Sequence, residues 1–168
     1  MGQLDTIMAK IILTDAGIQQ SLAYWRFKDY RIVFTNGCFD ILHRGHAEYL
    51  ARASDLGDVL VVGLNTDNSV RAIKGPGRPL QDEKSRALLL ASLSFVGAVI
   101  LFDQETPEEL IRLVQPDVLV KGSDYKPEDI VGHGIVTARG GRVETIDFIE
   151  GYSSSDIIKK ISGSDPQS

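Results

Sequence analysis

The chain has 168 residues, of which 43% are hydrophobic and 24% charged, a composition typical of one soluble globular domain. Its formal net charge of −5 gives no support for a nucleic-acid partner, so an anionic substrate would need a local cationic pocket. The single cysteine, Cys38, excludes a disulfide framework and fits a reducing compartment. Because no apolar run could span a membrane and no signal peptide precedes the domain, we expect a cytoplasmic protein.

Apolar patterning predicts strands and helices that alternate through a single domain at residues 1–168, with a less ordered lead-in at 1–15 and tail at 163–168. The predicted strands are 32–34, 58–65, 96–102, 117–121 and 142–149. The predicted helices are 16–28, 45–56, 83–93, one capped by Thr106 that ends before Pro116, a short one that begins at His133, and 157–161. Residues 66–82 are predicted to be a polar loop. The alternation indicates an α/β, Rossmann-like, doubly wound fold, with a mostly parallel five-stranded sheet and helices on both faces.

The most informative stretch follows the first long strand. Asn36-Gly37 predicts a turn, and His43-Arg44-Gly45-His46 then stands where a helix begins. A strand, a turn and a helix N-terminus form an anion site, because free backbone N–H groups point at the ligand. Two histidines could donate hydrogen bonds to phosphate oxygens, and Gly45 would let a phosphate approach the backbone.

Two other readings of this stretch remain: a solvated surface turn, or a metal site. A catalytic zinc would need a third ligand, and the remaining histidine, His133, is distant in sequence. We therefore assign no metal ligand and favour phosphate binding.

Three further features could bind phosphate. Lys74 and Arg78 flank glycines in the loop 66–82, which is either a plain surface connection or a mobile cationic lid. Lys121 ends a predicted strand, at the sheet edge where ligands bind in open α/β folds. The serines at 153–155 precede the last helix and are either a simple cap or a second phosphate cradle.

These motifs resemble the nucleotidyltransferase superfamily that carries the His-x-Gly-His signature. The run from Asn36 to Asp40, with two residues before His43, is similar to the branch that makes ADP-heptose from heptose 1-phosphate, and the resemblance extends over about residues 10–161. It implies transfer of AMP from ATP to a sugar 1-phosphate, with release of pyrophosphate, for lipopolysaccharide or other surface-sugar precursors. It also implies Mg²⁺ held by the nucleotide phosphates. The branch is often fused to a sugar kinase, so we expect a separate kinase to supply the acceptor here, and a homodimer is one option for the assembly.

The resemblance also implies roles for individual residues. His46 would contact the α-phosphate, His43 the β-phosphate or bridging oxygen, and Lys74 the developing charge. The residues expected to bind nucleotide are Asn36, Gly37, Cys38, Phe39, Gly45, His46, Lys121, Gly151, Ser153, Ser154 and Ser155. The residues expected to bind the acceptor are Asp40, Arg78 and Arg86. Arg86 could equally be a solvated helix residue.

The choice of nucleotide rests on one departure. Cytidylyltransferases of this type tend to read Arg-Thr-x-Gly-Ile-Ser where this chain has Phe148-Ile-Glu-Gly-Tyr-Ser153, and the missing arginine favours ATP over CTP. Three alternatives remain: a CTP-dependent enzyme acting on a small alcohol phosphate, a non-catalytic ATP-binding regulator, and a structural α/β domain. Two phosphate cradles from opposite ends of the chain, both expected at one sheet edge, favour an enzyme over the last two.

Overall fold

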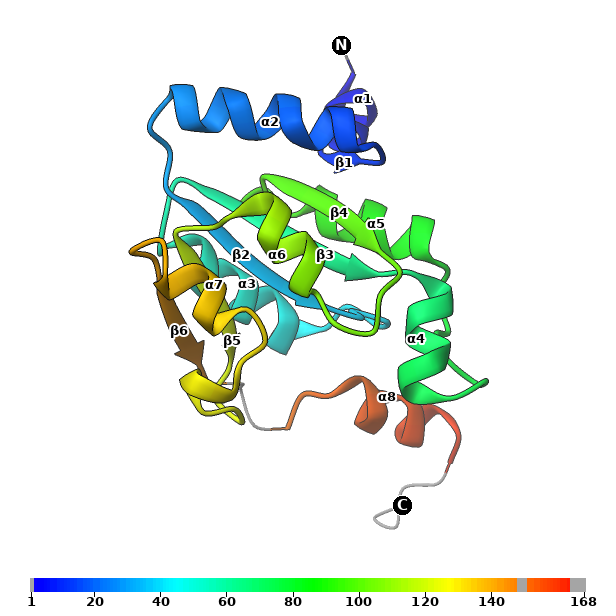
Figure 1. Ribbon diagram of the computed structural model, residues 1–168. Coiled ribbons are helices and arrows are strands. Elements are labelled where there is room, and N and C mark those ends of the chain that lie inside the picture. The colour runs from blue at the N-terminus through cyan, green and yellow to red at the C-terminus, as the bar shows by residue number, and fades with distance from the viewer. Residues whose placement is uncertain (1, 148–150, 164–168) are drawn as a thin grey trace.

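The computed structural model describes residues 2–147 and 151–163, which form a six-stranded, fully parallel sheet with helices on both faces (Figure 1). The strands are β1 (Ile11–Ile12), β2 (Ile32–Gly37), β3 (Val59–Asn65), β4 (Ala98–Phe102), β5 (Val118–Gly122) and β6 (Arg142–Ile146). The helices are α1 (Gln3–Met8), α2 (Asp15–Phe27), α3 (Arg44–Ser54), α4 (Asp67–Lys74), α5 (Glu83–Ser92), α6 (Glu108–Val114), the 3₁₀ turn η1 (Pro127–Asp129), α7 (His133–Thr137) and α8 (Ser154–Ile161). The predicted Rossmann-like class is confirmed, with one strand more than expected.

Successive side chains along each strand pack alternately into two separate hydrophobic cores, one on each face of the sheet. Ile32 and Phe34 of β2 pack with α2, α6 and α7 on one face, whereas Val33 between them packs with α3 and α5 on the other. This follows from the period of two in a strand, and it explains why the central strands are apolar at nearly every position. All seven residues of β3 are buried.

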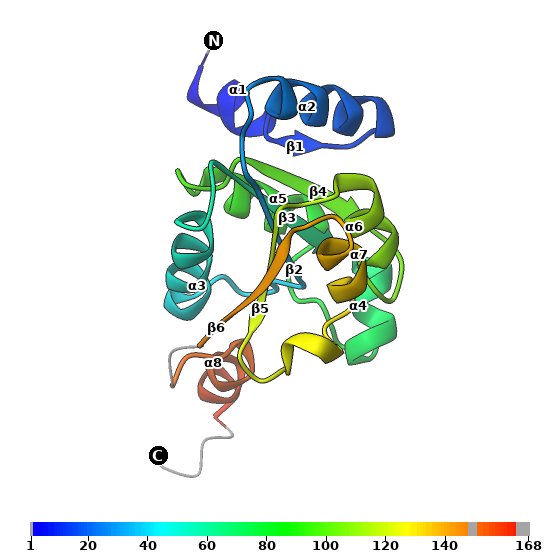
Figure 2. The ribbon, with the colours of Figure 1, turned by 60° about the vertical axis from the view of Figure 1, so that its left-hand side comes forward.

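The strand order β1-β4-β3-β2-β5-β6 reverses direction beside β2. From β2 the chain steps outward to β3 and β4, then crosses back to place β5 and β6 on the other side of β2 (Figure 2). In open α/β sheets, ligands bind outside the carboxyl ends of the strands at such a reversal. The crevice between β2 and β5 is therefore the expected ligand site. Both figures show α8 on the side of the molecule opposite α1 and α2.

Several predicted boundaries are wrong. Asn36 and Gly37 are not a turn but the end of β2, where they pair with Gly63 and Leu64 of β3. The predicted loop at 66–82 contains the helix α4, which is capped by the Thr66 hydroxyl. The sixth strand, β1, and the helix α1 lie in the predicted lead-in. Helix α6 begins at Glu108 with Pro107 at the N-cap, so Thr106 does not cap it.

The helices in the described part of the chain are all too short or too polar to cross a lipid bilayer. The residues at 148–150, which include the end of the last predicted strand, and those at 164–168, most of the predicted tail, lie outside the described ranges.

Candidate active site

A cavity of about 330 Å³ opens at the carboxyl ends of β2 and β5, at the reversal of strand order. Its wall comes from the end of β2 and the loop after it, from α3 and α4, from β5 and the following loop, and from α8. The residues that line it are Asn36, Gly37, Cys38, Phe39, Asp40, His46, Tyr49, Lys74, Lys121, Gly122, Asp124, Tyr125 and Ser154. Segments from both ends of the chain thus meet in one site.

The two signature histidines lie at the start of α3. His43 is the N-cap residue, and its Nδ1 accepts a hydrogen bond of 3.4 Å from the backbone N–H of His46. The two rings stack with centroids 3.7 Å apart, and the ring of Phe39 contacts His46 edge-on at 5.1 Å. His46 lines the cavity, whereas His43 stacks on it and is not part of the cavity wall. The chain reverses here at Phe39, whose φ of 44° is left-handed and therefore strained for a residue with a side chain.

The electrostatics of this pair favour neutral imidazoles. Burial, followed by the proximity of His43, lowers the pKa of His46 to about 4, and burial also lowers the pKa of His43. The Nδ1 of His46 is buried and has no hydrogen-bond partner among the described residues. At neutral pH His46 therefore presents an uncharged ring with one N–H donor and one acceptor.

The residues packed around Gly45 leave little room for a side chain at this position. A Cβ at this position would lie 3.1 Å from the ring of His43 and 3.2 Å from the Cβ of Tyr152. The predicted reason, close approach by a phosphate, is therefore not the first constraint, because Gly45 does not line the cavity and instead lets Tyr152, which precedes α8, pack against α3. The Tyr152 hydroxyl accepts a hydrogen bond of 3.3 Å from Arg44, whose guanidinium also lies over the tyrosine ring.

Two lysines supply positive charge to the cavity. Lys74 is the last residue of α4, and Lys121 lies near the end of β5. Burial lowers the pKa of Lys121 to about 8, although Asp124 and Cys38 act in the opposite direction. Cys38 lines the same cavity. Burial raises the pKa of its thiol, so it is a packed side chain and not an activated nucleophile.

The serine run before α8 divides into different roles. The Ser153 hydroxyl caps the helix by accepting from the N–H of Asp156. Ser154 lines the cavity and donates to the carbonyl of Ile41, 3.3 Å away. This bond holds α8 to the loop 38–43, which connects β2 to α3. Ser155 and Gly151 are exposed or partly exposed and do not line the cavity. Phe148, on which the sequence-based choice of ATP depends, lies outside the described residues.

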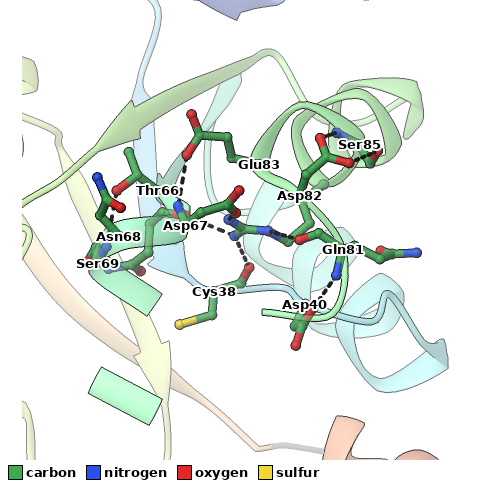
Figure 3. A network of polar contacts seen from close by, with 12 residues as sticks. Cys38, Asp40, Thr66, Asp67, Asn68, Ser69, Gln81, Asp82, Glu83 and Ser85 are labelled. Atoms are coloured by element: carbon green, nitrogen blue, oxygen red, sulfur yellow. Dashed lines mark hydrogen bonds and ion pairs between the residues drawn. The ribbon is translucent and has the colours of Figure 1, made fainter. Parts of the chain in front are cut away.

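The predicted acceptor-binding residues are held inside the protein. Arg86 is buried and donates to the carbonyls of Gln81, Cys38 and Asn65 and to the carboxylate of Asp67 (Figure 3). The structure thus gives Arg86 a structural role in place of the predicted contact with a phosphate. Asp40 touches the cavity, but its carboxylate pairs with Arg78, which itself is not part of the wall.

Sequence reasoning missed four residues that line the cavity, namely Tyr49, Gly122, Asp124 and Tyr125. Tyr49 lies one turn after His46 on α3, and its hydroxyl bonds to that of Thr35 at 2.8 Å. The i, i+3 spacing from His46 was the signal that could have identified it. Asp124, in the loop after β5, also reaches the wall. The buried Oδ1 of Asn36 has no partner in the described chain.

Comparison with known proteins agrees with this geometry. The family model described as Cytidylyltransferase-like matches residues 34–160. The bifunctional protein HldE of Wolinella succinogenes is 51% identical over 153 residues, which are 91% of this chain and 31% of that protein. HldE of Citrifermentans bemidjiense is 57% identical over 131 residues, covering 78% of this chain and 27% of that protein.

Two solved structures are also similar. The lipopolysaccharide core biosynthesis protein of Thermoplasma volcanium superposes with a TM-score of 0.60 and 30% identity, covering 74% of this chain and 99% of that one. The pantoate-beta-alanine ligase of Francisella tularensis has a TM-score of 0.60 at 14% identity over 90% of this chain and 76% of that one, a likeness of fold alone.

The chain spans about a third of the length of the HldE relatives it matches. The family model nevertheless includes every predicted catalytic and binding residue and both cradles. The chain belongs to the cytidylyltransferase-like family.

Proposed function

We propose that this protein transfers AMP from ATP to a sugar 1-phosphate, with heptose 1-phosphate as the favoured acceptor, giving an ADP-sugar and pyrophosphate. The observation that carries the proposal is the convergence of His46, Lys74, Lys121 and Ser154 on one cavity at the strand reversal. The relatives named HldE and the Thermoplasma protein named for lipopolysaccharide core biosynthesis support a role in surface-sugar precursors. The heptose itself rests on the resemblance alone.

The chemistry needs positioning more than proton transfer. A phosphate monoester has its second pKa near ~6, so the acceptor is already an anionic nucleophile at neutral pH. In-line attack on the α-phosphorus then builds negative charge on the α-phosphate oxygens and on the departing pyrophosphate. The neutral N–H of His46 would donate to the α-phosphate. His43 does not line the cavity, so we propose that it holds the His46 ring in place, instead of making the predicted contact with the β-phosphate or bridging oxygen.

The two lysines and α8 would hold the leaving group. Lys74 comes from the end of a helix and Lys121 from a strand, so they can neutralise charge from two sides of the triphosphate. The N-terminus of α8 would offer its free backbone N–H groups to the β- and γ-phosphates, while the Ser154 hydroxyl holds this helix to the carbonyl of Ile41.

The residues present suit Mg²⁺ that arrives with the nucleotide. Asp124 is a carboxylate on the cavity wall, while that of Asp40 is already paired with Arg78. We propose that phosphate oxygens and water supply most ligands of the ion, with Asp124 as the candidate protein ligand, and that the bound ion neutralises charge on the triphosphate. We further propose a cytoplasmic location, and a separate sugar kinase that supplies the acceptor.

The decisive experiment is pyrophosphate release with Mg²⁺, comparing ATP with CTP across sugar 1-phosphates and alcohol phosphates. We expect release with ATP and heptose 1-phosphate. His46→Ala should lower turnover by at least about a hundredfold, because it removes a donor to the reacting phosphate. His133→Ala is the matched control, since His133 opens α7 away from the cavity and should leave turnover unchanged.

The other outcomes separate the alternatives. Release only with CTP and an alcohol phosphate would identify the CTP-dependent enzyme. Tight ATP binding without release from any acceptor would identify a regulator. Full activity of His46→Ala would contradict the assigned role of that residue.

A further inference from the structure

We propose that Asp40 is a positioning residue. It fixes the segment 75–81 to the loop 38–43, which connects β2 to α3, and thereby holds Lys74 at its place in the cavity wall. The inference rests on the proposed nucleotidyl transfer, in which Lys74 contacts the phosphates. Residues 75–81 connect α4 to α5 and are here named the connecting segment. The predicted alternative was that Asp40 binds the acceptor.

Both carboxylate oxygens of Asp40 are occupied by the connecting segment. Oδ2 accepts from Nε of Arg78 at 2.5 Å, and Oδ1 accepts from the backbone N–H groups of Leu80 and Gln81 at 2.8 and 3.0 Å. The side chain of Asp40 is fully buried. Burial acts to raise its pKa, but these hydrogen bonds outweigh burial and hold the pKa below its usual value, so the group is ionised and saturated.

The far end of the connecting segment is held a second time by Arg86. Its Nε donates to the carbonyl of Gln81 at 3.0 Å, while Nη1 donates to the carbonyls of Cys38 and Asn65 at 2.6 and 2.9 Å. Cys38 follows β2 and Asn65 ends β3. Figure 3 shows Asp40, Cys38 and Gln81 grouped around this network. The end of the segment is therefore fixed against the ends of β2 and β3, and the end of β2 borders the cavity.

The near end of the segment carries the functional lysine. Lys74 closes α4, and Gly75 leaves the helix with a φ of 94°, a conformation that favours glycine. Among the described residues, none except the adjacent ones lies within 4 Å of the position that a Cβ would take at Gly75 or Gly77. The glycine part of the segment has little packing of its own, so its path depends on the point where Asp40 fastens it.

Hydrogen exchange and a double-mutant cycle would test the inference. In Asp40→Asn the ion pair is lost and an NH2 donor replaces the oxygen that faces the Arg78 donor, which pushes the side chain away from the connecting segment. We therefore expect faster exchange of the amides at 80 and 81 and a fall in kcat of about tenfold. If Asp40 acts through Lys74, adding Asp40→Asn to a Lys74→Ala protein should lower kcat by less than about a further twofold, because the lysine that Asp40 positions is already absent.

Asp82→Asn is the matched control. Asp82 makes the same kind of bonds to backbone N–H groups, but those bonds are to Lys84 and Ser85 of α5, outside the connecting segment. Asparagine also caps helices well, so exchange at 80 and 81 and kcat should stay at wild-type values. If Asp40→Asn lacks a cooperative thermal transition, Arg78→Gln takes its place, since it removes the same ion pair from the partly exposed side.

The outcomes are distinct. Unchanged exchange at 80 and 81, or equal losses of kcat from Asp40→Asn with and without Lys74, would overturn the inference. A wild-type protein without turnover on any acceptor would instead contradict the proposed function. The exchange measurement needs no substrate and would still decide whether Asp40 fastens the segment.

Discussion

His46 links the chemistry of the cavity to the stability of the fold. Its pKa is lowered by burial and by His43 to about 4, whereas an unfolded histidine titrates near ~6.5. Between these values the unfolded chain binds a proton that the folded protein does not. Stability must then fall as the pH decreases through this window, and the contribution of His46 is at most about 3 kcal/mol.

The corresponding prediction concerns His46→Gln. The wild-type free energy of unfolding should drop between pH 7 and pH 4.5, and the variant should lose much of this drop because glutamine does not titrate. Urea unfolding at the two pH values measures the difference. His133→Gln should retain the wild-type drop. Equal pH dependence in wild type and His46→Gln would show that the ring is protonated as easily in the folded protein as in the unfolded chain.

At single positions, local motifs in the sequence predicted several of the residues that line the site, but the partners that residues meet from distant parts of the chain could not be predicted. The order of His43 and His46, and a lysine near the end of a strand, can be read within a few residues of sequence. Asp40 meets Arg78, Leu80 and Gln81, and Arg86 meets Cys38, across separations of about 40 residues or more. A buried arginine saturated by carbonyls has the same local sequence signature as a solvated one, so its role could not be predicted.

At the scale of elements, the contact between α3 and Tyr152, just before α8, shapes the site. Gly45 lies in α3, where an alanine would gain helix propensity but its Cβ would meet the His43 ring at 3.1 Å and Tyr152 at 3.2 Å. Both are tighter than ordinary van der Waals contact. The gain of up to about 1 kcal/mol from propensity should therefore be offset by displacement of His43 or α8.

We accordingly expect Gly45→Ala to lower turnover in the pyrophosphate assay without raising the unfolding temperature. Gly134→Ala is the comparison, because Gly134 lies in α7 and no described residue outside its own helix backbone comes within 4 Å of the place that a Cβ would occupy. This variant should be more stable and fully active. If the two variants have the same turnover and unfolding temperature, the close packing of Tyr152 on α3 does not affect activity.

The elements that the sequence could not predict are short ones whose existence depends on neighbours. β1 has two residues and is held by its register with Val99 and Ile100 of β4, which no local periodicity signals. α4 was obscured by the Gly- and Pro-rich stretch that follows it, although Thr66 is a standard N-cap. The long apolar runs that became β3 and β5 needed no such context, since continuous burial is what a central parallel strand requires.

For the molecule as a whole, the open question is how far the folding unit extends toward the N-terminus. The backbone carbonyl of Lys10 accepts from the N–H of Val99 at 2.9 Å, and the Lys10 ammonium donates to the carbonyl of Leu93 at 3.2 Å. Ile7 and Ile11 pack on the core beneath α5, far from the strand reversal that holds the cavity. The predicted lead-in therefore completes the sheet edge and covers one core.

A pair of substitutions on α1 tests this extension. Ile7 is partly buried against the core, whereas Leu4 is 61% exposed, so Ile7→Ser removes packed apolar surface and Leu4→Ser removes only solvated surface. Ile7→Ser should lower the free energy of unfolding by about 1–2 kcal/mol, and Leu4→Ser should change it by less than about 0.5 kcal/mol. Both should keep the wild-type KM for ATP, because the cavity is built from other segments. Equal stability of the two variants in urea would mean that α1 is an appendage, and a raised KM in Ile7→Ser would mean that the N-terminal edge communicates with the site.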